Sequence, residues 1–245
     1  MMNRRYLLKS ALFLPLLAAK RPPAGVDWNA WFRDWLLHDF GMIGYYASDN
    51  AKLLASGARV DIVFMGDSIT EGWMDKRPAF FRGGRVNRGI GGQTSSQMLL
   101  RMMSDVVDLK PRAVHIMAGT NDIAGNTGPM TPQMTQENLR AMVDIARRHS
   151  ITVLIASIPP AAGFPWTPGL ETRRPIAAMN AWIKQFASQS RSTFIDYWPV
   201  LDDGTGAMKA GLASDGVHPT AAGYAAMEQV IEPVLHRLFP KERRS

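Results

Sequence analysis

The fold of this chain is decided by the stretch Val60-Asp61-Ile62-Val63-Phe64-Met65-Gly66-Asp67-Ser68. Its first six residues are mostly apolar and rich in β-branched side chains, which predicts a buried strand. Gly66 permits a tight turn, so Ser68 is expected at the carboxyl end of this strand, where it opens a helix. A helix start exposes unpaired N–H groups at the positive end of the helix dipole. Ser68 is therefore either a helix cap or a reactive hydroxyl placed beside hydrogen-bond donors.

Strand-like and helical patterns alternate along the chain after this stretch. Further strands are expected over residues 85–88, 113–117, 151–158 and 193–196. Helices are expected over residues 95–109, 135–149, 172–190 and 221–238. This alternation predicts an α/β fold with a parallel sheet that is covered by helices on both faces. Residues 27–56, ahead of the first strand, are expected to be helical and to pack their many aromatic side chains into the core.

The composition excludes several kinds of site. The chain has 245 residues, of which 46% are hydrophobic, and this fits one large domain. It has no cysteine, so disulfides, thiolate nucleophiles and zinc–thiolate sites are excluded. No apolar run reaches the ~20 residues of a membrane-spanning helix, so stable membrane insertion is not expected. The net charge is +7, but residues 22–245 hold 23 basic and 21 acidic residues with no basic stripe, so nucleic-acid binding is not expected either.

The N-terminal residues 1–19 are predicted to be a bacterial export signal. Arg4 and Arg5 form a basic start before a short apolar core that ends in small residues, a pattern typical of cleaved signals. Residues 3–9 also resemble a twin-arginine signal. The alternatives are an ordinary secretory signal and an uncleaved amphipathic anchor. We therefore expect a periplasmic or secreted protein.

This signal also sets the expected domain boundaries. Residues 20–26 contain two prolines and a glycine and are interpreted as a linker. Residues 27–245 are expected to form a single domain, in which residues 27–56 are an aromatic-rich helical extension at the N-terminal side.

His218 and Asp215 are the best partners for Ser68 in the sequence. A serine hydroxyl needs a base to become nucleophilic near neutral pH. His218 lies in a Gly/Pro-rich loop before the last helix, three residues after Asp215, so the carboxylate can bond one imidazole nitrogen and leave the other for Ser68. The alternative is a surface histidine beside a capping aspartate. His115 lies inside an apolar strand and is interpreted as a core residue.

Gly92 and Asn121 can supply donors for the oxyanion that forms when serine attacks a carbonyl. Gly91-Gly92 lets a backbone N–H approach closely, and Asn121 follows a predicted strand and carries an amide N–H. The alternatives are a plain glycine turn and an Asx turn. A phosphate cradle is disfavoured because the glycines are not followed by Lys-Ser or Lys-Thr.

Two aspartates flank these residues and raise the possibility of a metal site. Asp67 precedes Ser68, and Asp122 follows Asn121. No cluster of histidines accompanies them, so hydrogen bonds that fix the loops are the better interpretation, and no metal is expected.

Four motifs of the chain together resemble those of the SGNH (GDSL) hydrolases. They are Gly66-Asp67-Ser68, Asn87-Arg88-Gly89-Ile90-Gly91-Gly92, Gly119-Thr120-Asn121-Asp122 and Asp215-Gly216-Val217-His218-Pro219. By this resemblance, Ser68 matches the nucleophile, which also donates its N–H to the oxyanion. Gly92 and Asn121 match the other oxyanion-hole residues. Asp215 and His218 match the acid and the base.

The resemblance covers roughly residues 60–238. Residues 90–94 look most like the branch related to platelet-activating-factor acetylhydrolase and to carbohydrate acetylesterases. The resemblance implies a flavodoxin-like three-layer α/β/α sandwich with a parallel sheet of about five strands.

The motifs predict an exported serine esterase that removes a short acyl group, most simply acetyl, through an acyl-enzyme without a cofactor. The expected substrate is a small-molecule or glycan ester. One alternative is a lipolytic esterase or thioesterase for longer acyl chains. Another is a sugar-binding module without catalysis, since a fold alone does not imply a function.

The loop at residues 159–169 is the longest irregular stretch, and it follows the carboxyl end of a predicted strand. Phe164 and Trp166 in this loop have flat apolar faces that suit stacking on a sugar ring. Packing at the edge of the core is the equally weighted alternative.

Overall fold

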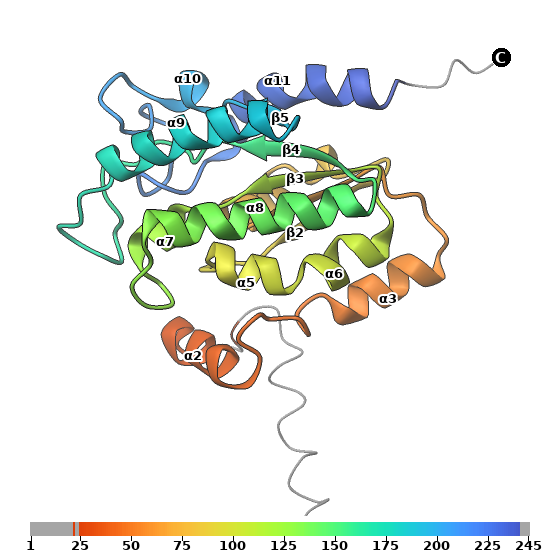
Figure 1. The fold of residues 1–245 in the computed structure, drawn as a ribbon. Helices are drawn as coiled ribbons and strands as arrows, with labels where there is room; N and C mark the ends of the chain where they lie inside the picture. Colours follow the sequence, from red (N-terminus) through yellow and green to blue (C-terminus); the bar gives the residue numbers. More distant parts are fainter. Residues whose placement is uncertain (1–21, 23–24, 241–245) are drawn as a thin grey trace, which may run out of the picture.

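The computed structural model describes Pro22 and residues 25–240 of the chain. Its centre is a sheet of five strands, all parallel, in the order β2-β1-β3-β4-β5 (Figure 1). The strands are β1 (Ile62–Gly66), β2 (Arg85–Gly89), β3 (Ala113–Met117), β4 (Thr152–Ala156) and β5 (Thr193–Ile195). The expected export signal lies outside the described residues.

Ten α-helices are present in the described part of the chain. They are α2 (Trp28–His38), α3 (Ala47–Ala55), α4 (Ser68–Lys76), α5 (Ser95–Leu100), α6 (Met102–Asp105), α7 (Thr120–Ala124), α8 (Pro132–Arg148), α9 (Arg173–Gln189), α10 (Trp198–Leu201) and α11 (Ala221–Leu238). Two short 3-10 helices, η2 (Pro78–Phe80) and η3 (Val107–Leu109), complete the set. None of the described helices is both long and apolar enough to span a bilayer.

Helices cover both faces of the sheet, which confirms the predicted three-layer α/β/α sandwich. On one face α4 packs against α11, where the rings of Trp73 and Tyr224 stack at 5.5 Å. On the other face α8 packs against α9, and the Arg140 guanidinium lies 5.1 Å from the centre of the Trp182 ring. The central strands β1, β3 and β4 are apolar and almost fully buried, as expected for a parallel sheet covered on both faces, whereas the edge strands β2 and β5 are partly exposed.

The register of the strands places three of the sequence motifs at one rim. Gly66 at the end of β1 pairs with Gly89 at the end of β2 and with Met117 at the end of β3. The chain therefore leaves all three strands at the same level. The order of the strands also reverses here, since β2 lies on one side of β1 and β3 on the other. Open α/β sheets bind their ligands at such a position.

The aromatic N-terminal segment forms a separate small core. Seven residues make up this cluster: Trp31, Phe32, Trp35, Met42, Tyr45, Tyr46 and Ile90. Six of them come from α2 and the chain that follows it, and Ile90 comes from the loop after β2. The expectation that the aromatics of this segment are packing residues is confirmed for the five in the cluster, which pack on the rim of the sheet rather than into its main core, but it is wrong for Trp28, which is 41% exposed.

Two helices differ from the sequence-based prediction. The expected helix over residues 95–109 is broken into α5, α6 and η3, because Arg101 leaves helical geometry and turns its side chain into the interior. The helix expected from residue 135 begins earlier, at Pro132. Its cap is Thr131, whose hydroxyl accepts the N–H of Met134, and proline at the first helical position fits this arrangement.

Candidate active site

Ser68, His218 and Asp215 meet at the rim of the sheet although 150 residues separate the first two. The Ser68 hydroxyl lies 2.9 Å from Nε2 of His218. Nδ1 of the same ring lies 2.7 Å from Oδ2 of Asp215. Ser68 is the first residue of α4, and the other two lie in the loop before α11. One imidazole thus joins a hydroxyl to a carboxylate, the geometry in which histidine can accept the serine proton.

Hydrogen bonds within the loop hold Asp215 and His218 in this arrangement. Oδ1 of Asp215 accepts the backbone N–H groups of Val217 at 3.0 Å and His218 at 2.8 Å. Burial opposes ionisation of Asp215, but the hydrogen bonds from His218 and Val217 outweigh it and lower the pKa of this carboxyl. Asp215 is therefore ionised near neutral pH, and it fixes the imidazole tautomer that faces Ser68.

Three possible oxyanion donors surround the Ser68 hydroxyl. The backbone N–H groups of Ser68 and Gly92 donate to no acceptor among the described residues. Asn121 uses one amide hydrogen for the carbonyl of Gln93 at 3.0 Å. Asn121 lines the cavity, and its second amide hydrogen has no acceptor among the described residues. These donors come from the starts of α4 and α7 and from the loop after β2.

The backbone at Gly92 and at Gly119 requires glycine. Both residues have positive φ, 77° at Gly92 and 128° at Gly119. A Cβ at Gly92 would lie 3.0 Å from the ring of Phe32, and one at Gly119 would lie 2.4 Å from Ile158. Gly119 is the N-cap of α7, so its backbone conformation sets the direction in which α7, which carries Asn121, leaves β3.

The two flanking aspartates have hydrogen-bond partners in the loops. Asp122 accepts the backbone N–H of Ser95 at 2.9 Å, the hydroxyl of Ser95, and that of Thr135 at 3.0 Å. Burial nevertheless raises the pKa of Asp122. Asp67 caps α4 by accepting the N–H of Ile69 at 2.9 Å. Burial raises the pKa of Asp67 to about 6. Asp122 thus ties the segment after β3 to α5 and α8, whereas Asp67 stabilises the start of α4.

The Ser68 hydroxyl faces a cavity of about 540 Å³. Its lining combines aromatic rings with polar side chains. The lining residues outside the four motifs are Trp28, Asn29, Phe32, Glu71, Ala124, Gly125, Asn126, Trp166 and Thr167. Trp166 is 40% exposed and lies on the buried ring of Phe164, with their ring centres 5.2 Å apart and their planes nearly parallel. Of the two loop aromatics, Trp166 therefore presents a face to the cavity and Phe164 supports it from below.

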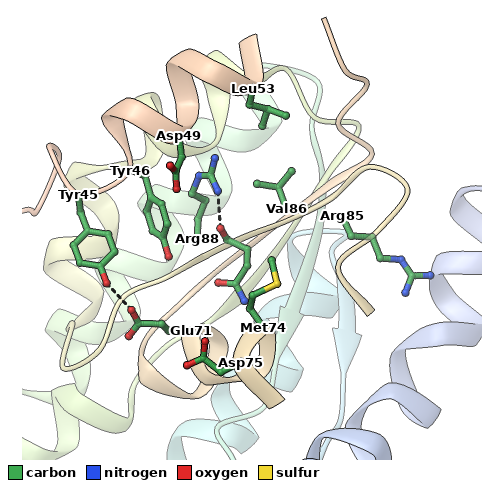
Figure 2. Close-up of a pocket in the computed structure, with 11 residues that line it drawn as sticks. Tyr45, Tyr46, Asp49, Leu53, Glu71, Met74, Asp75, Arg85, Val86 and Arg88 are labelled. Carbon is green, nitrogen blue, oxygen red and sulfur yellow. Dashed lines mark hydrogen bonds between the residues drawn. The ribbon is translucent and has the colours of Figure 1, made fainter. Parts of the chain in front are cut away.

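The N-terminal segment forms one wall of this cavity. Trp28 and Phe32 project from α2 over Gly91 and Gly92, where a Cβ would meet their rings at 3.2 Å and 3.0 Å. The Tyr45 hydroxyl donates to Oε1 of Glu71 at 2.5 Å, and Oε2 of Glu71 accepts the N–H of Gly91 at 2.8 Å. Figure 2 shows Tyr45 and Glu71 facing each other in the adjoining pocket, which shares Glu71 with the cavity.

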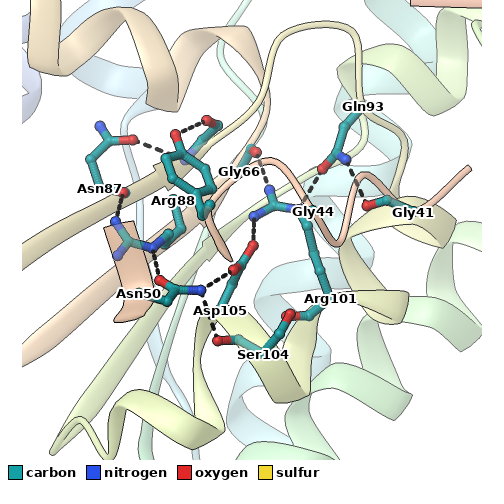
Figure 3. A network of polar contacts seen from close by, with 12 residues as sticks. Gly41, Gly44, Asn50, Gly66, Asn87, Arg88, Gln93, Arg101, Ser104 and Asp105 are labelled. Atoms are coloured by element: carbon teal, nitrogen blue, oxygen red, sulfur yellow. Dashed lines mark hydrogen bonds and ion pairs between the residues drawn. The ribbon is translucent and has the colours of Figure 1, made fainter. Parts of the chain in front are cut away.

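A buried polar network fixes the same loop from beneath. The fully buried Arg101 donates to the side chain of Gln93 at 2.6 Å, to the carbonyl of Gly66 at 3.1 Å and to Asp105 at 2.9 Å (Figure 3). Asn50 of α3 donates to Asp105 at 2.7 Å, which extends the network into the N-terminal segment. Since a buried ion pair needs all its partners, this network ties the end of β1 rigidly to the loop after β2.

Sequence reasoning missed several residues of the cavity. Glu71 lies three residues after Ser68, one turn along the same helix face, and this spacing could have indicated it. Trp28 and Phe32 gave no such signal, because helical spacing of aromatics also fits plain packing. Asn126 lies just beyond the motif that contains Asn121, and nothing in its neighbours marks it.

His115 has the role that the sequence suggested. It is fully buried in β3, and its Nε2 lies 3.0 Å from the Tyr197 hydroxyl. Burial lowers the pKa of His115 to about 3, so the ring is neutral.

Comparison with known proteins identifies relatives over most of the chain. The profile of the GDSL-like Lipase/Acylhydrolase family matches residues 64–226. Esterase TesA of Pseudomonas aeruginosa is 30% identical over 156 residues, which is 63% of this chain and 70% of that protein. A lipoprotein of Bacillus subtilis, YqeF, whose function is uncharacterised, is 36% identical over 118 residues. This match spans 40% of this chain and only 49% of that relative.

A solved structure extends the similarity to the whole fold. The GDSL-like lipase from Bacteroides thetaiotaomicron is 38% identical, with a TM-score of 0.76. The alignment covers 81% of this chain and 99% of that one.

Proposed function

The chain belongs to the GDSL-like lipase/acylhydrolase family, and we propose that it is an exported serine esterase that removes short acyl groups, acetyl above all, from a carbohydrate. The observation that carries this proposal is the contact series from Ser68 through His218 to Asp215, which opens onto a cavity with polar and aromatic walls.

The proposed reaction has two steps. The Ser68 hydroxyl attacks the ester carbonyl while His218 takes its proton, and the oxyanion is held by N–H groups of Ser68, Gly92 and Asn121. Collapse of this intermediate releases the alcohol, which receives the proton from His218. Water then attacks the acyl-Ser68 ester, with His218 as base, and releases the acid. Asp215 keeps the imidazole oriented and stabilises its positive charge.

The lining of the cavity favours a short acyl group. Glu71 brings a carboxylate to the wall, and Asn29 brings an amide. Seating a long apolar chain against these groups would strip them of water without giving them new hydrogen bonds, which is costly. An acetyl group needs little room and leaves them hydrated or bonded to hydroxyl groups of the substrate.

Trp28 and Trp166 support a carbohydrate as the alcohol component. Both rings line the cavity that receives the Ser68 hydroxyl, and Trp166 lies near the catalytic histidine, with its ring centre 5.8 Å from that of His218. A flat aromatic face packs well on the apolar face of a sugar ring, while the neighbouring Asn29 amide can bond its hydroxyl groups.

A substrate series tests this specificity. We expect kcat/KM to be highest for p-nitrophenyl acetate and to fall toward octanoate. We also expect Trp166→Ala to raise KM for an acetylated glycan about tenfold, a loss of ~1.4 kcal/mol, with little change in KM for p-nitrophenyl acetate. Steady-state kinetics on both substrates measure these effects.

The matched control for that series is Trp182→Ala. Trp182 also stacks on a phenylalanine, Phe186, with ring centres 4.9 Å apart, but it lies on α9 outside the cavity. Its loss should affect both substrates equally. A kcat/KM that rises from acetate to octanoate would instead support a lipolytic esterase.

Export is proposed from the basic and apolar pattern of residues 1–19. A bacterial host that expresses the full chain should therefore hold a shortened protein in its periplasm or medium. Changing both Arg4 and Arg5 to lysine should block export if the twin-arginine route is used. Cell fractionation with N-terminal sequencing measures this, and a cytoplasmic protein that keeps Met1 or Met2 would refute it.

A further inference from the structure

The side chain of Asn126 touches both of the oxyanion-hole elements that lie outside α4. Its Nδ2 donates to Oδ1 of Asn121 at 2.8 Å and to the carbonyl of Gly92 at 3.2 Å. Its Oδ1 accepts the indole N–H of Trp166 at 3.1 Å. Both amide hydrogens and the amide oxygen of Asn126 are therefore engaged, so its side chain is committed to these neighbours rather than to a substrate.

We propose that Asn126 is a positioning residue of the oxyanion hole, which holds Asn121 and Gly92 in their working geometry and couples both to Trp166. The inference rests on the proposed function, because it assumes that Asn121 and Gly92 stabilise an oxyanion. It concerns a residue outside the four motifs of the sequence.

The amide of Asn121 must have one orientation to work. Its nitrogen side can donate to an oxyanion, whereas its oxygen side would repel one. The bond from Nδ2 of Asn121 to the Gln93 carbonyl and the bond from Asn126 to Oδ1 of Asn121 both specify the donating orientation. Without Asn126, a single contact remains to hold the amide among the described residues.

The contact with Gly92 restrains the peptide next to the other donor. Gly92 has positive φ and no side chain, so little in its own structure limits rotation about its backbone bonds. The bond from Asn126 fixes the Gly92 carbonyl and the plane of the Gly92–Gln93 peptide, and this peptide adjoins the Gly91–Gly92 peptide that carries the donating N–H. Donors that are fixed before the reaction stabilise the developing charge best, since they need no reorganisation.

The backbone supports this placement of Asn126. α7 ends at Gly125, which has a φ of 72°, and the N–H of Asn126 then donates to the backbone carbonyl of Asn121 at 3.1 Å. The turn brings the two asparagines side by side although they are five residues apart. Trp166 donates to the side-chain amide of Asn126 from the loop after β4. A group that packs on Trp166 therefore acts, through this hydrogen bond, on the residue that orients the oxyanion hole.

The experiment compares three variants on p-nitrophenyl acetate. Asn126→Ala should lower kcat about 10- to 100-fold with KM changed less than about twofold, because losing one oxyanion donor altogether costs about 10²–10³. Asn126→Asp has the same shape but lacks both donors, so it should lose at least as much. Trp166→Phe keeps the ring and loses the N–H, and should lower kcat only a few-fold without raising KM.

A second readout separates positioning from general stability. Diethyl p-nitrophenyl phosphate should phosphorylate Ser68 with its phosphoryl oxygen in the oxyanion hole, so its inactivation rate should fall in parallel with kcat/KM. Asn180→Ala is the control, because Asn180 also bridges two backbone groups of a loop, the N–H and carbonyl of Ile158, but does not touch Asn121 or Gly92. Asn180→Ala should lower the melting temperature and leave kcat unchanged.

The outcomes are distinct. Near-native kcat in Asn126→Ala, full activity in Asn126→Asp, or equal losses in the Asn180 control would each overturn the inference. Ser68→Ala is measured alongside. Activity in that variant would count against the proposed function itself, whereas an inactive Ser68→Ala with an unaffected Asn126→Ala would overturn only the role of Asn126.

Discussion

Replacement of Ser68 by alanine should lower kcat at least about 10³-fold while the protein remains folded. The reason is chemical, because alanine has no atom that can attack the ester or carry the acyl group. Among the described residues the Ser68 hydroxyl hydrogen-bonds only to His218, and α4 is capped by Asp67 rather than by Ser68. The fold should therefore tolerate the change, which circular dichroism and the melting temperature can verify.

Ser188→Ala is a matched control for this variant. Ser188 is an exposed serine on α9, remote in the chain from the four motifs, and its loss should leave kcat unchanged. Near-native esterase activity in Ser68→Ala would refute Ser68 as the nucleophile.

Replacement of His218 by alanine should be nearly as damaging as replacement of Ser68. Without the imidazole, the serine proton has no acceptor 2.9 Å away, and the departing alcohol has no proton donor. Because the two residues act as one unit, the double variant should be little worse than either single variant. Steady-state kinetics of the three proteins measure this, and additive losses would contradict it.

Asp215→Asn should cost less than His218→Ala, since the amide keeps the shape of the carboxyl but loses its charge. The lowered pKa of Asp215 also determines how its contribution to the stability of the folded protein depends on pH. A carboxyl with a lowered pKa in the folded state contributes stability above its unfolded value of ~3.8 and loses it as the pH falls through the folded value. Protonation of Asp215 should therefore affect the enzyme only in acid.

The sequence predicted the sheet and the meeting of the motifs for the same physical reason. Apolar runs rich in β-branched residues mark buried strands, and parallel strands bring their carboxyl ends to one rim. Ser68 and Asn121 each follow such a run directly, so their convergence needed only the register, which the structure supplies. His218 was harder to place, because it is brought in by the loop before α11 and not by a strand.

The walls of the cavity could not be predicted in the same way. Whether Trp28 packs inward or lines a site depends on what lies opposite α2, and this is Gly91, distant in the sequence. The sequence left Phe164 and Trp166 equally suited to bind substrate or to pack, and in the structure Phe164 is buried while Trp166 lines the cavity. Side-chain choices of this kind depend on tertiary contacts, which local patterns do not contain.

The position of the N-terminal segment connects the second core to the proposed chemistry. The Tyr45 hydroxyl donates to Glu71, and Glu71 accepts the N–H of Gly91, which is next to Gly92, the proposed oxyanion donor. The aromatic cluster thus packs against one side of the loop after β2, while Arg101 bonds Gln93 of the same loop from beneath.

Labelling with a serine-directed phosphonate tests the central claim most directly. The reagent mimics the ester, and its phosphorus should be attacked by the hydroxyl that His218 activates. Intact-mass and peptide mass spectrometry should show one adduct per chain, on Ser68, with loss of activity in proportion to labelling. The Ser68→Ala and His218→Ala variants should take up no label on the same timescale. An adduct on another residue, or full activity in protein whose Ser68 is completely labelled, would contradict the account.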